Sequence, residues 1–126
     1  MISRTKVFDK IQAHFFPILL LVSNLVVALG TELAHDEAYY WLFSKNLDWG
    51  YFDHPPMTAW IIALTSWIPG EIGVRFGYIV LVQFSAWLIS RLVPKENSWF
   101  VWYGFNAFPL LAFGGIFAIP DGPLVI

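Results

Sequence analysis

Acidic and histidine side chains gather in the segment 35–54, and these are the residues best suited to chemistry. His35, Asp36 and Glu37 follow one another directly, and Asp53 and His54 form a second such group. A helix over 35–47 would place Asp36 and Glu37 in its first turn, where the helix dipole favours an ionised carboxylate. Such a carboxylate beside aromatic residues fits a general base or a cation ligand. The alternative for Asp36 and Glu37 is a pair of solvated acids at a helix start.

The second group has two interpretations of its own. Asp53 precedes two prolines and would cap the helix that they open, or it would reach toward Asp36 if the loop folds back. His35, Asp53 and His54, together with Asp36, would offer nitrogen and oxygen ligands to a divalent metal. Their spacing matches no standard zinc pattern, and a hard cation held by carboxylates alone is equally compatible. Asp121 lies in a Pro-Asp-Gly-Pro sequence, which is also ordinary turn chemistry.

The elements that must position these residues belong in lipid. The 126 residues are 58% hydrophobic and only 13% charged, about half the charge of a soluble domain, which excludes an ordinary soluble or disordered protein. The absence of cysteine excludes disulfides and thiolate zinc sites. A net charge of −2 argues against nucleic acid as a partner. The composition therefore predicts an all-α polytopic membrane protein.

Three segments are long and apolar enough to be transmembrane helices: 11–31, 72–92 and 97–119. In the second, Arg75 and Arg91 lie near the ends and are expected to snorkel to the headgroups. In the third, a kink is expected near Pro109. The stretch 55–70 is short and suits an interfacial or re-entrant helix, with Trp60 and Trp67 on one face. If it spans instead, everything after it reverses orientation; a cleaved signal peptide is the alternative for 11–31.

Basic residues set the expected orientation. The N-terminal tail carries Arg4, Lys6 and Lys10, and the loop after 92 carries Lys95 beside Arg91, so both belong in the cytoplasm. The segment 32–71 holds Lys45 as its one base and therefore faces outward, with six acids: Glu32, Asp36, Glu37, Asp48, Asp53 and Glu71. Asp121 emerges on the same outer side. The expected location is a bacterial inner membrane.

Four ordered motifs resemble a known enzyme family. They are Asp-Glu-Ala-Tyr-Tyr-Trp at 36–41, Gly-Tyr-Phe-Asp-His-Pro-Pro at 50–56, Gly-Val-Arg-Phe at 73–76 and Pro-Asp-Gly-Pro-Leu at 120–124. Together they resemble the N-terminal part of family 39/83-type glycosyltransferases of the GT-C fold, such as protein O-mannosyltransferases and the aminoarabinose transferase of lipid A. The resemblance covers nearly the whole chain, with 120–126 as the start of a second external loop.

The resemblance implies inverting sugar transfer from a polyprenyl-phosphate donor to a lipid, protein or glycan hydroxyl on the outer face. It implies that Asp36 is the base that activates the acceptor. It associates Asp53, with its neighbour His54, and Asp121 with donor phosphate or a cation. Family members are several times longer, so this chain is expected to be a fragment that is inactive by itself. The alternatives are a small non-enzymatic membrane protein, serving assembly or lipid binding, and a transporter fragment.

Overall fold

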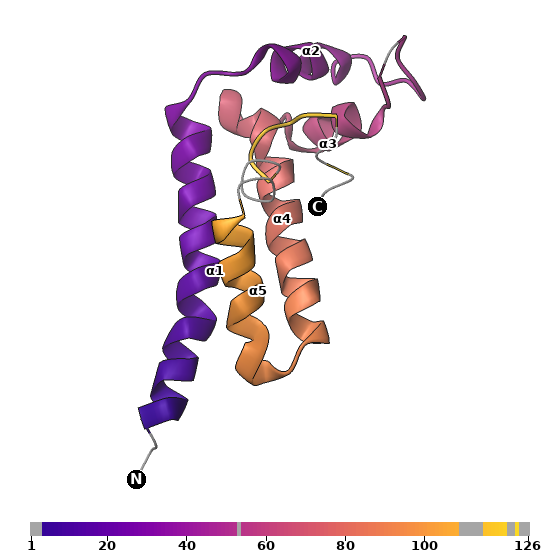
Figure 1. Cartoon of the computed structure of the whole chain (residues 1–126). Coiled ribbons are helices and arrows are strands. Elements are labelled where there is room, and N and C mark those ends of the chain that lie inside the picture. Colours follow the sequence, from indigo (N-terminus) through magenta and orange to yellow (C-terminus); the bar gives the residue numbers. More distant parts are fainter. Residues whose placement is uncertain (1–3, 53, 109–114, 121–122, 124–126) are drawn as a thin grey trace.

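The described part of the chain folds into two groups of helices, and one group lies across an end of the other (Figure 1). The computed structural model describes residues 4–52, 54–108, 115–120 and 123, with side chains from His14 onward, and this part contains no strand. Three helices run alongside one another: α1 (Arg4–Gly30), α4 (Glu71–Leu92) and α5 (Ser98–Ala107). Two short helices, α2 (His35–Phe43) and α3 (Met57–Thr65), lie across the end where α1 stops and α4 begins (Figure 1).

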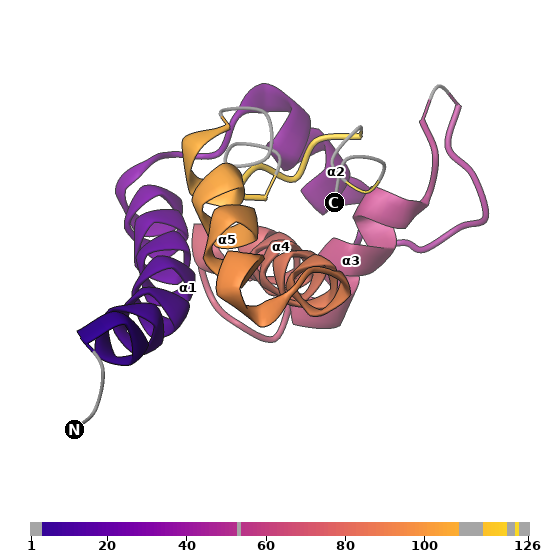
Figure 2. The same ribbon diagram turned by 60° about the horizontal axis from the view of Figure 1, so that its bottom comes forward.

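The bundle is built around α4, which contacts α1, α3 and α5 (Figure 2). Between α1, α4 and α5 the buried cluster contains Leu20, Val82, Ala86, Trp102 and Phe105. Under α2 and α3 a second cluster contains Tyr40, Ile61, Ile62, Val74, Tyr78 and Ala118. Glycine lets α3 approach α4 closely, because a Cβ on Gly77 would lie 2.6 Å from Cγ2 of Ile61. These contacts fix the position of α2 and α3 relative to α4.

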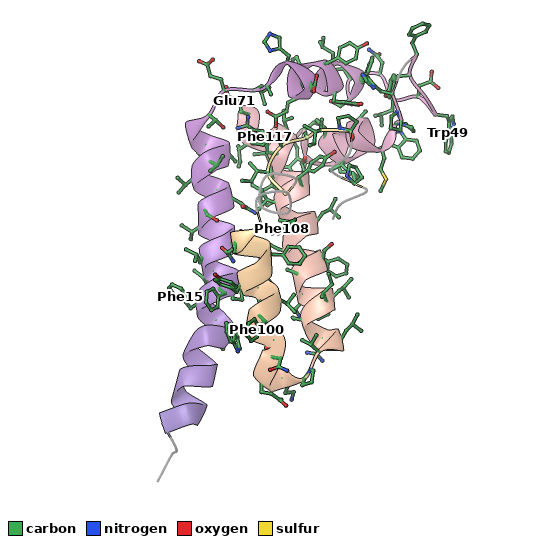
Figure 3. All side chains as sticks on the ribbon, in the orientation of Figure 1. Phe15, Trp49, Glu71, Phe100, Phe108 and Phe117 are labelled. Atoms are coloured by element: carbon green, nitrogen blue, oxygen red, sulfur yellow. The ribbon has the colours of Figure 1, made fainter. Side chains whose placement is uncertain are left out.

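In the described part of the chain, α4 is the one helix that is long and apolar enough by itself to cross a membrane. The segment His14–Gly30 of α1 qualifies only together with α2, from which it is bent by 89°. The helix predicted over 72–92 is therefore confirmed, whereas a polytopic protein with three spans is not. The outer surface is apolar: Phe15 on α1 is 54% exposed, and Phe100 on α5 is 57% exposed (Figure 3).

The helix predicted over 97–119 is shorter than expected. Helix α5 has ten residues and is about 15 Å long, half the thickness of a bilayer core. It ends at Ala107, and Phe108 is extended (φ −89°, ψ 109°), because a following proline disfavours helical backbone. Residues 115–120 form turns and irregular chain rather than a helix. The kink expected at Pro109 lies outside the described residues.

The short helix expected within 55–70 is present as α3, whose nine residues are too few to span a bilayer. Its buried side chains are Thr58, Ala59, Ile61 and Ile62. The expectation that Trp60 and Trp67 share one helix face is wrong, because α3 ends at Thr65 and Trp67 lies in the following turn. Trp60 is half-buried, and Trp67 is 77% exposed.

Candidate active site

The Asp36-Glu37 pair begins α2, and the local sequence explains why the helix starts there. Ala34 is extended (φ −66°, ψ 159°), and its backbone N–H donates to Oε2 of Glu37 at 2.9 Å. This is one half of a capping box, since Ala34 has no side-chain oxygen to complete the other half. The helix was expected over 35–47, but it ends at Phe43 and continues as turns to Asn46.

The two acids of the pair have opposite environments. Asp36 is exposed, whereas Glu37 is fully buried. Helical spacing would also allow Asp36, Tyr40, Phe43 and Leu47 to form the buried face. The buried side chains are instead those of Glu37, Tyr40 and Ser44, and Leu47 is 56% exposed. Spacings of three and four residues fit either set, so tertiary contacts chose between them.

Glu37 forms a buried bidentate ion pair with Arg75 of α4. The Nε of Arg75 donates to Oε1 of Glu37 at 2.8 Å, and Nη2 donates to Oε2 at 2.6 Å. Both side chains are 0% exposed. Paired hydrogen bonds of this kind are the strongest ion-pair geometry and hold both groups in one orientation. The ion pair thereby fixes the start of α2 to α4.

Arg75 also binds the end of α1 and the linker that follows it. Its Nη1 donates to the carbonyl oxygens of Ala28 at 3.1 Å and Thr31 at 2.8 Å, and to the Thr31 hydroxyl at 2.8 Å. Its Nη2 donates to the carbonyl oxygen of Glu32 at 2.8 Å. The expectation that Arg75 snorkels to lipid headgroups is therefore wrong. A buried carboxylate and the free carbonyls at the end of α1 satisfy its donors instead.

The segment after α5 returns to the same point. The backbone N–H of Ala118 donates to Oε1 of Glu37 at 3.1 Å, and the Phe117 ring lies 5.2 Å from the Arg75 guanidinium carbon. Nearby, the Tyr78 hydroxyl donates to the Thr58 hydroxyl at 3.0 Å. The ion pair thus joins three stretches of chain that are distant in sequence: residues 28–37, Arg75 and Ala118. Asp121 itself lies outside the described residues.

These contacts divide the roles that the two acids can play. Each Glu37 oxygen accepts two hydrogen bonds, so this carboxylate is already saturated by the protein. Within the described residues the Asp36 carboxylate has no hydrogen bond or ion pair, and it projects from a helix turn that Glu37 and Arg75 hold in place. Asp36 is therefore the acid of the pair that can accept a proton from a substrate, and Glu37 is suited to positioning it.

The proposed metal ligands are only partly within the described residues. His35 is exposed. His54 is half-buried against aromatic rings, 5.6 Å from the ring centre of Tyr39 and 5.2 Å from that of Tyr40. Asp53 lies outside the described residues, and among those that are described no group of three His, Cys, Asp or Glu side chains could hold a metal ion. The metal site therefore stays a prediction.

Two residues that shape the site were not predicted to do so from the sequence. One is Arg75, for which the signal was a cation followed by fifteen uncharged residues, since ionisable residues inside membrane helices usually have a functional partner. The other is Tyr51, whose ring stacks on Phe43 with centres 4.0 Å apart and whose hydroxyl lies 3.1 Å from the Phe43 carbonyl oxygen. Tyr51 thereby packs against the end of α2.

Comparison with known proteins gives one informative similarity. The chain is 30% identical, over 99 residues, to the lipid A galacturonosyltransferase RgtD of Rhizobium johnstonii. The alignment covers 73% of this chain and 21% of that protein, so the chain spans about a fifth of the length of this curated relative. No family model matches the chain. No solved structure matches it. The similarity supports a relationship to glycosyltransferases and no finer assignment.

Proposed function

We propose that this chain is part of an integral-membrane glycosyltransferase with Asp36 as its general base. The enzyme transfers a sugar from a polyprenyl-phosphate donor to a hydroxyl of a lipid, protein or glycan on the outer face of the membrane. The observation that carries the proposal is the division of the acid pair: Asp36 is exposed, while Glu37 is saturated by Arg75 and two backbone N–H groups. The similarity to a lipid A galacturonosyltransferase supports the reaction class.

In the proposed reaction the Asp36 carboxylate accepts the proton of the acceptor hydroxyl. The acceptor oxygen attacks the anomeric carbon, and the bond from that carbon to the phosphate oxygen breaks. The polyprenyl phosphate leaves with the bonding electron pair, and attack from the opposite side inverts the anomeric configuration. A general base of this kind typically contributes about 10²–10⁴-fold to the rate.

Glu37 and Arg75 act in this proposal through position. Because both are buried and mutually bound, they fix the first turn of α2 and so fix where the Asp36 carboxylate projects. Asp53, His54 and Asp121 stay proposed as groups for the donor phosphate or a cation. The described residues contain no cation-ligand cluster, and we derive no step through a metal ion.

The test uses the protein expressed from its own gene, with the Asp36→Asn variant assayed in isolated membranes. Galacturonic acid is the first sugar and lipid A the first acceptor to try, because the relative's name specifies them. The sugar is supplied on polyprenyl phosphate, the donor class proposed here. We expect Asp36→Asn to lower transfer by about 10²–10⁴-fold with the protein level unchanged. The matched control is Glu32→Gln, an exposed acid four residues earlier. Near-normal transfer by Asp36→Asn contradicts the proposal.

A further inference from the structure

A basic and aromatic cavity lies at the end of the bundle opposite α2. It has a volume of about 660 Å³, within the usual range of ligand sites. It lies between the last turn of α4, the start of α5 and the middle of α1, and its lining includes Pro17, Trp87, Arg91, Lys95, Ser98 and Trp102. Helix α4 has 22 residues and is about 33 Å long; the cavity lies at its C-terminal end, whereas α2 lies at its N-terminal end. The cavity is therefore remote from Asp36.

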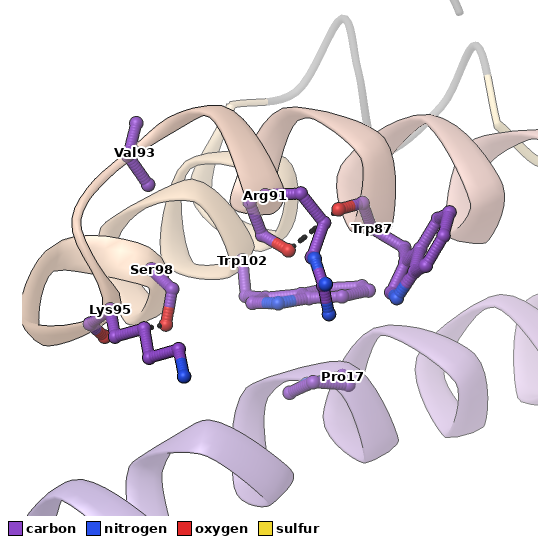
Figure 4. A pocket seen from close by; sticks show the side chains of 8 residues that line it. Pro17, Trp87, Arg91, Val93, Lys95, Ser98 and Trp102 are labelled. Carbon is purple, nitrogen blue, oxygen red and sulfur yellow. Dashed lines mark hydrogen bonds between the residues drawn. The ribbon is translucent and has the colours of Figure 1, made fainter.

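The two cations of the cavity are free to bind an anion. In Figure 4 the side chains of Arg91 and Lys95 point toward α1, into the space above Pro17. Among the side chains that the structure describes, neither forms an ion pair, and Glu96, the acid next to Lys95, does not line the cavity. The guanidinium carbon of Arg91 lies 5.8 Å from the ring centre of Trp87, which orients it without neutralising it.

The walls of the cavity are apolar and continue onto the exposed face of α4. Trp102 is 8% exposed and forms a buried wall, whereas Trp87 is 47% exposed. One turn earlier along α4, Phe84 stacks on Trp87 with ring centres 5.8 Å apart and is 52% exposed. A ligand with a phosphate group attached to a hydrocarbon chain fits this arrangement. Its phosphate would contact the two cations, and its hydrocarbon chain would lie along Trp87 and Phe84.

We propose that this cavity binds the headgroup of an anionic phospholipid. Basic pockets between membrane helices on the cytoplasmic side are suited to anionic headgroups, and the basic residues of this end favour the cytoplasm. A free phosphate would use Arg91 and Lys95 but would gain nothing from the aromatic continuation. The site is separate from sugar transfer, so its occupancy is measurable without an activity assay.

The experiment measures binding of short-chain lipids to the purified protein in neutral detergent, by native mass spectrometry. The probes are dioctanoyl phosphatidylglycerol, dioctanoyl phosphatidylcholine and inorganic phosphate. We expect phosphatidylglycerol to bind more tightly than the other two. Arg91→Gln should weaken it about fivefold, and Arg91→Gln/Lys95→Gln about 25-fold, since each cation near an anionic lipid contributes roughly this factor. Arg91→Lys should retain binding.

Lys45→Gln is the matched control, because it removes one exposed cation from the other end of the molecule. It should leave phosphatidylglycerol binding unchanged, and circular dichroism should show equal helix content in all variants. If phosphatidylcholine binds as tightly as phosphatidylglycerol, the site does not recognise the headgroup charge and the proposal is wrong. If inorganic phosphate binds as tightly as phosphatidylglycerol, the ligand is a phosphate group and not a lipid. Unchanged binding in Arg91→Gln/Lys95→Gln overturns the site.

Discussion

The Glu37–Arg75 ion pair makes a prediction whose size follows from its contacts. In Glu37→Gln the new amide NH₂ replaces one carboxylate oxygen. If it replaces Oε2 it faces two donors, Arg75 Nη2 and the Ala34 N–H; if it replaces Oε1 it faces Arg75 Nε and the Ala118 N–H. Either orientation loses two hydrogen bonds, at least one to a charged group, and leaves a buried guanidinium without its counter-charge. We expect a loss of about 3–5 kcal/mol in the free energy of unfolding.

The assay is reversible unfolding in mixed micelles with increasing dodecyl sulfate, followed by circular dichroism. Arg75→Met should destabilise by a similar amount, because it leaves the Glu37 carboxylate buried and unpaired. The double variant Glu37→Gln/Arg75→Met removes both charges and should cost less than the sum of the single variants by about 1–3 kcal/mol. Glu32→Gln, whose side chain is exposed, is the control and should stay within about 0.5 kcal/mol.

Two results refute the reasoning. A cost below about 1 kcal/mol for Glu37→Gln means that the carboxylate is hydrated in the native protein rather than saturated by Arg75 and the backbone. Strict additivity in the double variant means that the two side chains do not interact in the folded state. Either result would also remove the basis for a positioning role of Glu37 toward Asp36.

Two further predictions concern packing and orientation. Gly73→Ala places a Cβ 2.1 Å from the Ile68 carbonyl oxygen, so it should lower the free energy of unfolding by about 1–3 kcal/mol in the same assay. The control is Gly104→Ala, whose Cβ has nothing within 4 Å and which should leave the stability unchanged or raise it. The described chain lacks cysteine, so single cysteines report sidedness. In intact cells an impermeant maleimide should label Asn46→Cys, and it should label Asn97→Cys only after permeabilisation. The reverse pattern contradicts the predicted orientation.

The residues by themselves predicted much of the architecture. The apolar run ending in Arg91 predicts a helix over 72–92, and the structure has α4 at Glu71–Leu92. The prolines before Met57 and the shortness of the apolar stretch predict a helix too short to span, as α3 is. The acids at 36 and 37 predict a helix start. These features are local, because they depend on chain length, proline and helix-end chemistry, and local rules capture them.

For the helix predicted over 97–119, the sequence predicts the start correctly but not the end, because α5 begins at Ser98 and ends at Ala107. Continuous hydrophobicity over 97–119 favours one long helix, while Phe108 becomes extended before a proline. Residues 115–118 then pack against α2 and α4, with Gly115 so close to Val82 that a Cβ would lie 2.7 Å from it. Hydrophobicity reports burial in lipid or in protein alike, so it does not distinguish a span from a segment that folds back.

Composition and residue order suffice to predict an apolar helical chain whose acids are concentrated in one segment between hydrophobic runs. They do not tell which acid of the pair is available, because that depends on contacts between distant parts of the chain. Asp36 and Glu37 are neighbours of nearly equal chemistry, and a helix permits either to face inward. Arg75, 38 residues away from Glu37, selects Glu37 by a bidentate contact and leaves Asp36 exposed. That choice depends on the Arg75 side chain reaching from α4 to the start of α2, a contact across 38 residues that no local pattern encodes.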